Sequence, residues 1–246
     1  MLNLMATTLS PGATLAKRTC VFDRLTASSP NIKSATLTRI STADLRLLFE
    51  LYDKIFFDHR FTQVYQGRLK FSLSQRMTKS AGKTFFPRHP DKISPGEMTI
   101  EIRMGTDFFF KYDEIDCDKT VCGITTTSAL EAFLLVFEHE LCHVIEFIHF
   151  NNSNCSGKRF KTIAKNIFGH TASYHELPTH RQIARVKYGL KIGDPVTFTY
   201  EGKKVKGILY NINKRATVMV GDKNGNYTDK RGNRYTKYYV PLEFLV

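Results

Sequence analysis

The sequence predicts an α+β protein in which a domain of mixed helices and strands is followed by a small all-β barrel. Residues 132–150 are apolar on nearly every side, which indicates a helix buried at the centre of the first domain. Two earlier segments, 67–74 and 98–104, alternate apolar and polar residues as half-buried strands do. After Tyr188, short strand-like segments separated by turn residues indicate a barrel of the SH3-like kind.

Length and composition set the limits of this prediction. The chain has 246 residues, 42% of them hydrophobic, which is enough for one core with a small second domain. No apolar segment approaches the ~20 residues that cross a bilayer, so we expect no membrane association. The five cysteines are odd in number and irregularly spaced, which argues against a disulfide framework and predicts a reducing, intracellular compartment.

The chain is expected to divide into three parts. Residues 1–35 are poor in acidic residues and rich in Ser, Thr, Ala and Leu. They are predicted to be a disordered tail, with an N-terminal organelle-targeting segment as the alternative. Residues 36–188 form the main domain, and residues 189–246 form the small barrel.

Within the main domain, Thr42 is expected to cap the first helix, whose buried face carries Leu45, Leu48, Phe49, Tyr52 and Ile55. A loop at 76–84 follows the first strand. Ser128-Ala-Leu-Glu131 has the form of a capping box, which places the start of the central helix there. After a polar loop at 151–156, a further amphipathic helix ends at Gly169.

The C-terminal region combines strand signals with positive charge. Four or five short strands are expected, among them 193–200, 204–210 and 216–220, and residues 240–245 close the chain. Residues 181–246 hold 14 Lys or Arg against 5 Asp or Glu, which is most of the chain's formal net charge of +13. A localised excess of this kind indicates a polyanionic partner, here DNA, with a merely solubilising surface as the alternative.

The central helix carries the string His139-Glu-Leu-Cys-His143, which is an H-E-x-x-H motif. Successive residues of a helix are about 100° apart, so the two histidines lie about 40° apart on one face. His139 and His143 are therefore predicted to be zinc ligands, with Glu140 as the general base on a zinc-bound water. A catalytic zinc normally has a third protein ligand, which this motif does not contain.

Two neighbours of the motif have other expected roles. Cys142 points away from the metal face and is predicted to pack in the core. Glu146 falls on the metal face. It is expected either to orient a metal-binding residue from the second coordination shell or to form an ordinary salt bridge.

Residues 36–180 resemble the SprT-like metallopeptidase family, which includes the Spartan protease. The features that carry the resemblance stand in the family's order: Ile55-Phe-Phe57, the string R-M-T-K-S-A-G-K-T at 76–84, the strand at 99–103, the H-E-x-x-H motif, and Phe168-Gly-His-Thr171 with His175. The resemblance implies a zinc endopeptidase with a compact α+β zincin domain. It also implies a role in DNA repair, because eukaryotic members degrade proteins crosslinked to DNA.

The chain departs from the family at the expected third ligand. Family members supply a histidine in the pattern H-G-x-x-F, where this chain has Ser156-Gly-Lys-Arg-Phe160. Serine is a poor zinc ligand, so another residue must take its place if zinc is bound. The open candidates are His149, His170, His175 and His180, of which His170 is expected instead to pack or to contact substrate.

The leading prediction is therefore a zinc endopeptidase that acts on DNA-associated proteins, in the nucleus or elsewhere on DNA. The alternative is a catalytically weak or inactive SprT-like protein that serves as a DNA- or chromatin-binding module. A transcription regulator is a third reading, and it rests on the basic barrel alone. The protein substrates, the form of DNA and the oligomeric state are not predicted.

Overall fold

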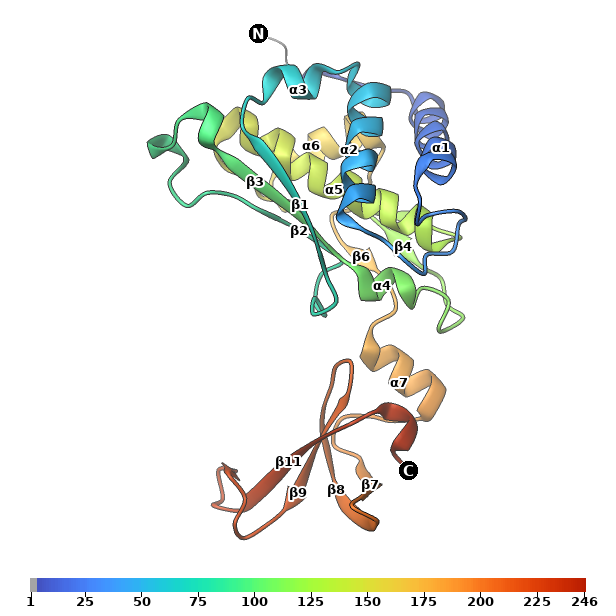
Figure 1. Cartoon of the computed structure of the whole chain (residues 1–246), viewed down its shortest axis with the longest axis vertical. Coiled ribbons are helices and arrows are strands. Elements are labelled where there is room, and N and C mark those ends of the chain that lie inside the picture. The colour runs from blue at the N-terminus through green and yellow to red at the C-terminus, as the bar shows by residue number, and fades with distance from the viewer. Residues whose placement is uncertain (1–3) are drawn as a thin grey trace. The chain divides into compact units, whose positions relative to one another are not determined.

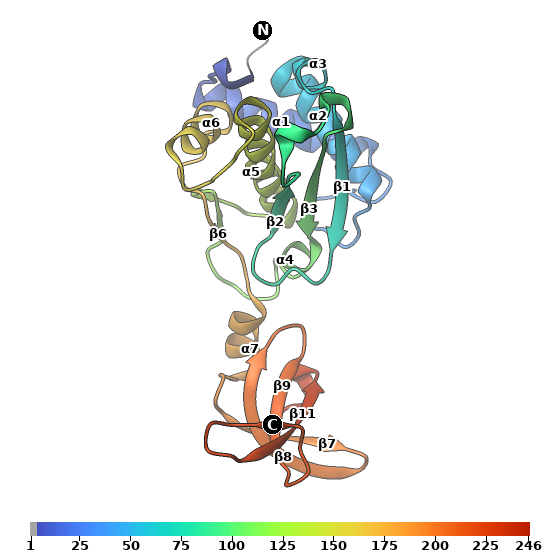
Figure 2. The same ribbon diagram turned by 90° about the vertical axis from the view of Figure 1, so that its left-hand side faces the viewer.

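A computed structural model describes residues 4–246 of the chain (Figures 1 and 2). The chain divides into two compact units, the first ending at Leu177 and the second spanning Pro178–Val246. The predicted boundary after residue 188 is therefore too late. The reason is that helix α7 (His180–Tyr188) contributes Ala184 to the hydrophobic cluster of the second unit.

The first unit begins with helices, where a disordered tail was predicted. They are a 3-10 turn η1 (Leu4–Ala6) and the helices α1 (Pro11–Ser28), α2 (Thr42–Phe57) and α3 (Arg60–Val64). The prediction of disorder is wrong for residues 4–35, and residues 1–3 lie outside the described part of the chain. Ser10 caps α1, and Val21 and Leu25 bury its apolar face in the main core.

The N-cap of α2 lies one residue earlier than predicted. Ser41, and not Thr42, is the N-cap, and it forms a capping box with Asp44. In Figures 1 and 2, α2 lies beside α1, and the two helices pack together.

A three-stranded sheet follows, with the strand order β1-β3-β2. Strands β1 (Arg68–Ser74) and β3 (Thr99–Gly105) confirm the two predicted strands and pair in parallel. Strand β2 (Gly82–Phe85) pairs antiparallel with β3 and lies at the end of the segment that was predicted to be a loop. Two 3-10 turns, η2 (Pro90–Lys92) and η3 (Pro95–Glu97), connect β2 to β3.

One face of this sheet is covered by helices. Phe71, Ile102 and Thr84 are neighbours in the strand register, so their side chains lie on the same face. The ring of Phe71 contacts Phe49 of α2 and Phe137 of α5, which shows that both helices cover that face.

The remainder of the first unit is built around the long helix α5 (Ala129–Phe150), which is buried along most of its length. It is preceded by α4 (Thr106–Phe110), β4 (Thr120–Val121) and β5 (Ile124–Thr125), and followed by α6 (Lys158–Phe168) and β6 (His175–Glu176). The short strands form a second sheet in the order β5-β4-β6. The predicted N-cap at Ser128 is confirmed, although the Glu131 carboxylate accepts from Thr127 and not from Ser128.

The second unit contains α7 and an antiparallel five-stranded sheet with the order β10-β11-β9-β8-β7. Its elements are β7 (Pro195–Tyr200), β8 (Lys203–Ile212), β9 (Ala216–Gly221), β10 (Tyr227–Thr228), β11 (Arg234–Val240) and the 3-10 turn η4 (Leu242–Phe244). The strands predicted at 193–200, 204–210 and 216–220 correspond to β7, β8 and β9. The last strand ends at Val240, and η4 follows it within the closing segment 240–245. Between residues 178 and 246 no strand ladder joins β7 to β10, so the predicted barrel is an open sheet. Val246 exchanges two backbone hydrogen bonds with Thr197 at the β7 edge.

None of the helices described in residues 4–246 is both long and apolar enough to cross a membrane.

Candidate metal and active site

Helix α5 holds the H-E-x-x-H residues on a face that is buried inside the first unit. His139 and Glu140 are 5% and 3% exposed, and the two histidine rings lie 5.0 Å apart between their centroids. Phe160 of α6 packs against both rings, at 4.9 Å from His139 and 4.5 Å from His143. The aromatic residue of the S-G-K-R-F string therefore supports the histidines.

Two groups of potential metal donors converge on this site, and both include His139. The first group is His139, His143 and Cys155, and the second is Cys122, His139 and His175. Within each group the donor atoms lie within 4.8 Å of one another. Nitrogen and sulfur donors of this kind suit zinc, so the residues present fit the metal that the motif implies.

Of the four histidines considered as a third ligand, the structure brings only His175 to the site. The β4–β6 ladder places His175 opposite Val121, and its ring lies 5.0 Å from that of His139. His149 lies in the last turn of α5, and His180 begins α7 in the second unit. Neither belongs to a donor group. The hydroxyl of Ser156 donates to Asn154 Oδ1 at 2.8 Å.

Burial keeps the clustered imidazoles uncharged. It lowers the pKa of His139 to about 2, with further contributions from the neighbouring histidines. Burial also lowers the pKa of His143 and of His175 to about 4. All three rings are therefore neutral at pH 7, which is the form that binds a metal.

A short relay fixes the orientation of His143. Its Nδ1 lies 2.7 Å from Ser153 Oγ, and that hydroxyl donates to Glu146 Oε2 at 2.7 Å. The hydroxyl proton is thus directed to Glu146, so His143 must carry its own proton on Nδ1, which leaves the lone pair of Nε2 available to a metal. Glu146 also pairs with Arg159 at 3.3 Å, so the structure contains both of the predicted arrangements for this carboxylate.

Strand β2 positions the carboxylate of Glu140. Thr84 Oγ1 donates to Glu140 Oε2 at 2.6 Å. The contact is possible because the Thr84 side chain lies on the face of the sheet that the helices cover. Burial raises the pKa of Glu140 to about 7, against the opposing effect of the Thr84 hydrogen bond. A Cβ at Gly82 would lie 2.6 Å from Glu140 Oε1 and 2.8 Å from Val136 Cγ1, so the strand needs a glycine at this point.

This close approach gives a test of the site. Gly82→Ala is expected to destabilise the first unit by about 1–3 kcal/mol, because the added methyl overlaps the Glu140 carboxylate and forces β2 and α5 apart. Gly96→Ala is the matched control, since a Cβ there meets nothing within 4 Å. Hydrogen exchange at the amides of β2 and α5 measures the effect. Equal protection in the two variants would contradict the packing described here.

A buried ionic network lies at Glu138, the residue that precedes His139 on α5. Its carboxylate is fully buried and accepts from Arg18 Nε at 2.8 Å and Arg18 Nη2 at 2.7 Å. The Tyr52 hydroxyl donates to it at 2.8 Å, and His170 Nε2 lies 2.9 Å from Oε2. Burial alone would raise the pKa of Glu138, but the charge and hydrogen bonds of Arg18, together with His170, hold it below its usual range. His170 is buried, its Nε2 is directed to Glu138, and it belongs to neither donor group. The network joins α1, α2 and α5 beside His139.

Several residues of the site were not singled out from the sequence. Gly82 and Thr84 belong to the R-M-T-K-S-A-G-K-T string, which indicates the family resemblance. The string alone does not predict that these two residues contact Glu140. Cys155 directly precedes Ser156, in the loop where the missing ligand was sought. Cys122 and Arg18 had no local signal. Cys142 is fully buried and belongs to neither donor group, in line with the core role expected for it.

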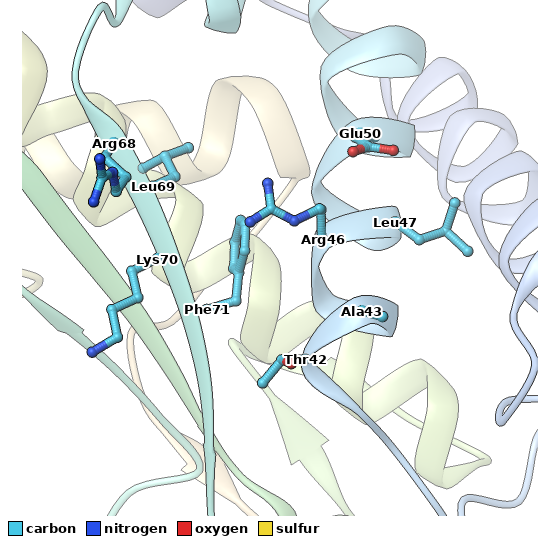
Figure 3. Close-up of a pocket in the computed structure, with 9 residues that line it drawn as sticks. All are labelled: Thr42, Ala43, Arg46, Leu47, Glu50, Arg68, Leu69, Lys70 and Phe71. Atoms are coloured by element: carbon cyan, nitrogen blue, oxygen red, sulfur yellow. The ribbon is translucent and has the colours of Figure 1, made fainter. Parts of the chain in front are cut away.

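A separate groove of about 430 Å³ lies between α2 and β1 (Figure 3). It is lined by Thr42, Ala43, Arg46, Leu47, Glu50, Arg68, Leu69, Lys70 and Phe71. The Arg46 side chain reaches over the Phe71 ring, 5.9 Å from its centroid. The lining includes no residue of the histidine cluster, so we assign this groove no part in the active site.

Comparison with known proteins agrees with the geometry. Residues 45–182, from the first turn of α2 into α7, match the family model described as the SprT-like family. Neither the curated proteins nor the solved structures that were searched gave a significant match. The match covers more than half of the chain and includes the H-E-x-x-H helix, strand β2 and both donor groups. The chain therefore belongs to the SprT-like family.

Proposed function

We propose that this protein is a zinc-dependent endopeptidase that acts on proteins bound or crosslinked to DNA. The observation that carries the proposal is the buried carboxylate of Glu140, held by Thr84 on the same helix that carries the two neutral donor histidines. His139 and His143 would hold the zinc, together with a third donor from one of the two groups. Bound zinc would polarise the scissile carbonyl and lower the pKa of a water molecule towards ~7.

The protein's own contribution to catalysis centres on Glu140. A carboxylate whose pKa is raised to about 7 can both accept and release a proton near neutral pH. Glu140 takes the proton of the attacking water and returns it to the leaving amine. The Thr84 hydroxyl holds one carboxylate oxygen during both transfers.

Strand β2 offers a place for the substrate. Within residues 4–246 it pairs with β3 alone, so its other edge is open for hydrogen bonds with an extended peptide. Because Gly82 and Thr84 contact Glu140, a peptide along this edge would pass close to the general base. Backbone pairing of this kind has little dependence on side chains, which suits loosely selective cleavage.

The metal site is tested by metal analysis of the purified protein. We expect about one zinc per chain, which is lost in His139→Ala because one of the few ligands is removed. His149→Ala is the control, since His149 lies on the same helix outside both donor groups and should retain the metal. Wild-type protein without bound metal at neutral pH would overturn the proposed function.

The second unit carries a surface suited to DNA. Ile208, Met219 and Lys237 are neighbours in the strand register, and Tyr227 pairs with Tyr235 on the same face. Alternation along β8 and β11 adds further residues to this open face, which comprises Lys204, Lys206, Ile208, Met219, Tyr227, Tyr235, Lys237 and Tyr239. The opposite face packs Leu209 and Val218 into the small core.

This open face combines exposed rings with cations. Tyr227 and Tyr239 are 43% and 62% exposed, and Lys237 Nζ lies 3.8 Å from the Tyr227 ring centroid. Aromatic rings that stack on bases, beside lysines that contact phosphates, are typical of single-stranded DNA binding. We therefore assign the proposed DNA contact to this face.

Substitution of one tyrosine tests this assignment. Tyr239→Ala is expected to weaken binding of a labelled oligo-dT by about 1–3 kcal/mol, because one stacking ring is removed. The control is Tyr200→Ala, since Tyr200 is also exposed but contacts Tyr238 on the other face. Fluorescence anisotropy over a salt series measures both affinities, and binding should fall steeply as salt rises. Equal losses in the two variants would contradict the assigned face.

A further inference from the structure

We propose that Cys155 is the third protein ligand of the metal site, so that the donor set is two histidines and one cysteine. The inference rests on the proposed zinc site. It chooses between the two donor groups, which share His139.

The first argument is convergence. Cys155, His139 and His143 have donor atoms within 4.8 Å of one another. Ligands of a tetrahedral zinc at about 2.1–2.3 Å from the metal are about 3.4–3.8 Å apart, so either donor group needs to close by at most about 1–1.4 Å. The group with Cys155 uses both histidines of the motif, whereas the group with Cys122 and His175 uses His139 alone.

The second argument is that the loop around Cys155 is anchored to the metal helix. The backbone N–H of Asn154 donates to Glu146 Oε2 at 2.9 Å, beside the Ser153 hydroxyl that orients His143. On the other side of Cys155, the Gly157 N–H donates to the Asn154 carbonyl at 2.9 Å. One carboxylate thus positions both His143 and the turn that presents Cys155.

The third argument concerns which imidazole nitrogens already have a partner within the protein. Cys122 Sγ lies 3.7 Å from Nδ1 of His139 and 3.7 Å from Nδ1 of His175, and Ser153 occupies Nδ1 of His143. The Nδ1 atoms of both motif histidines therefore have partners within the protein, which leaves their Nε2 atoms for a metal.

Access to substrate also separates the two groups. Cys122 is fully buried, whereas Cys155 is partly exposed. A metal in the Cys155 group can therefore keep a coordination position open to water and substrate, as a catalytic site requires.

Cobalt substitution tests the assignment without any measurement of proteolysis. Full-length protein loaded with Co²⁺ should show a sulfur-to-cobalt charge-transfer absorption in the near ultraviolet. Cys155→Ser should lose this band and bind Co²⁺ at least ~10-fold more weakly. Cys155→His should restore binding without the band, and Cys122→Ser should keep both. His175→Ala replaces Cys122→Ser as the control if the buried substitution prevents folding.

The outcomes separate this inference from the proposed function. Loss of the band in Cys122→Ser, with its retention in Cys155→Ser, would overturn the inference in favour of the other group. Co²⁺ bound by the wild type without a sulfur band would also overturn it, while leaving the zinc site intact. A wild-type protein that binds no Co²⁺ would overturn both.

Discussion

Glu140→Gln is expected to lower the rate of proteolysis by about 10²–10⁴-fold while leaving the zinc content unchanged. Glutamine keeps the size of the side chain and an oxygen that accepts from Thr84, so α5 and β2 should pack as before. The amide has no basic oxygen that can take a proton from water. The substitution therefore removes the proton transfer and preserves the metal site.

Cleavage of a DNA-bound protein by the purified chain, followed on gels with and without DNA, measures this effect. Glu50→Gln is a suitable control, because Glu50 is exposed on α2. Full activity of Glu140→Gln would exclude Glu140 as the general base. A wild-type chain that binds both zinc and DNA but cleaves nothing would favour the alternative of a DNA- or chromatin-binding module.

Arg18→Met is expected to destabilise the first unit by about 3–5 kcal/mol, because it leaves the fully buried Glu138 carboxylate without its cation. Tyr52 and His170 remain as hydrogen-bond partners, but they do not replace the bidentate guanidinium. Because Arg18 also donates to the Phe168 carbonyl, its loss frees the C-terminal end of α6 as well.

Hydrogen exchange of α1 and α5 peptides is the appropriate measurement, since the chain has two units and a single melting curve would combine them. Arg24→Met, on the exposed side of the same helix, is expected to change stability by no more than about 0.5 kcal/mol. A second substitution, Glu138→Gln, should recover part of the loss, because it removes the unpaired charge. Equal protection in Arg18→Met and Arg24→Met would mean that the ion pair contributes little.

Much of the first unit was predictable because its signals are local. The apolar pattern and the Ser128 cap identify α5, and the spacing of His139 and His143 places them on one helix face whatever surrounds them. The strands β1 and β3 were predicted from alternation for the same reason. Alternation does not say which strands pair, so their parallel pairing and the third strand β2 appeared only in the structure.

The N-terminal helix shows the limit of local reasoning. The helix has a single acidic residue, Asp23, fewer than a typical surface helix, and its sequence resembles a tail when taken alone. The contacts that hold it come from distant parts of the chain, through buried Val21 and Leu25 and through Arg18 to Glu138. A segment stabilised mainly by tertiary contacts carries little signal in its own sequence.

By itself, the sequence determined the H-E-x-x-H helix, the likeness to SprT-like proteins, and the absence of a histidine at Ser156. Only the tertiary structure decided which donors stand near that motif. It brought His175 through the β4–β6 ladder and Cys155 through a loop bound to Glu146, and it turned His170 towards Glu138. The physical reason is that two ligands on one helix follow from helical periodicity, whereas a third must come from another segment. Its position depends on how loops and strands pack against that helix.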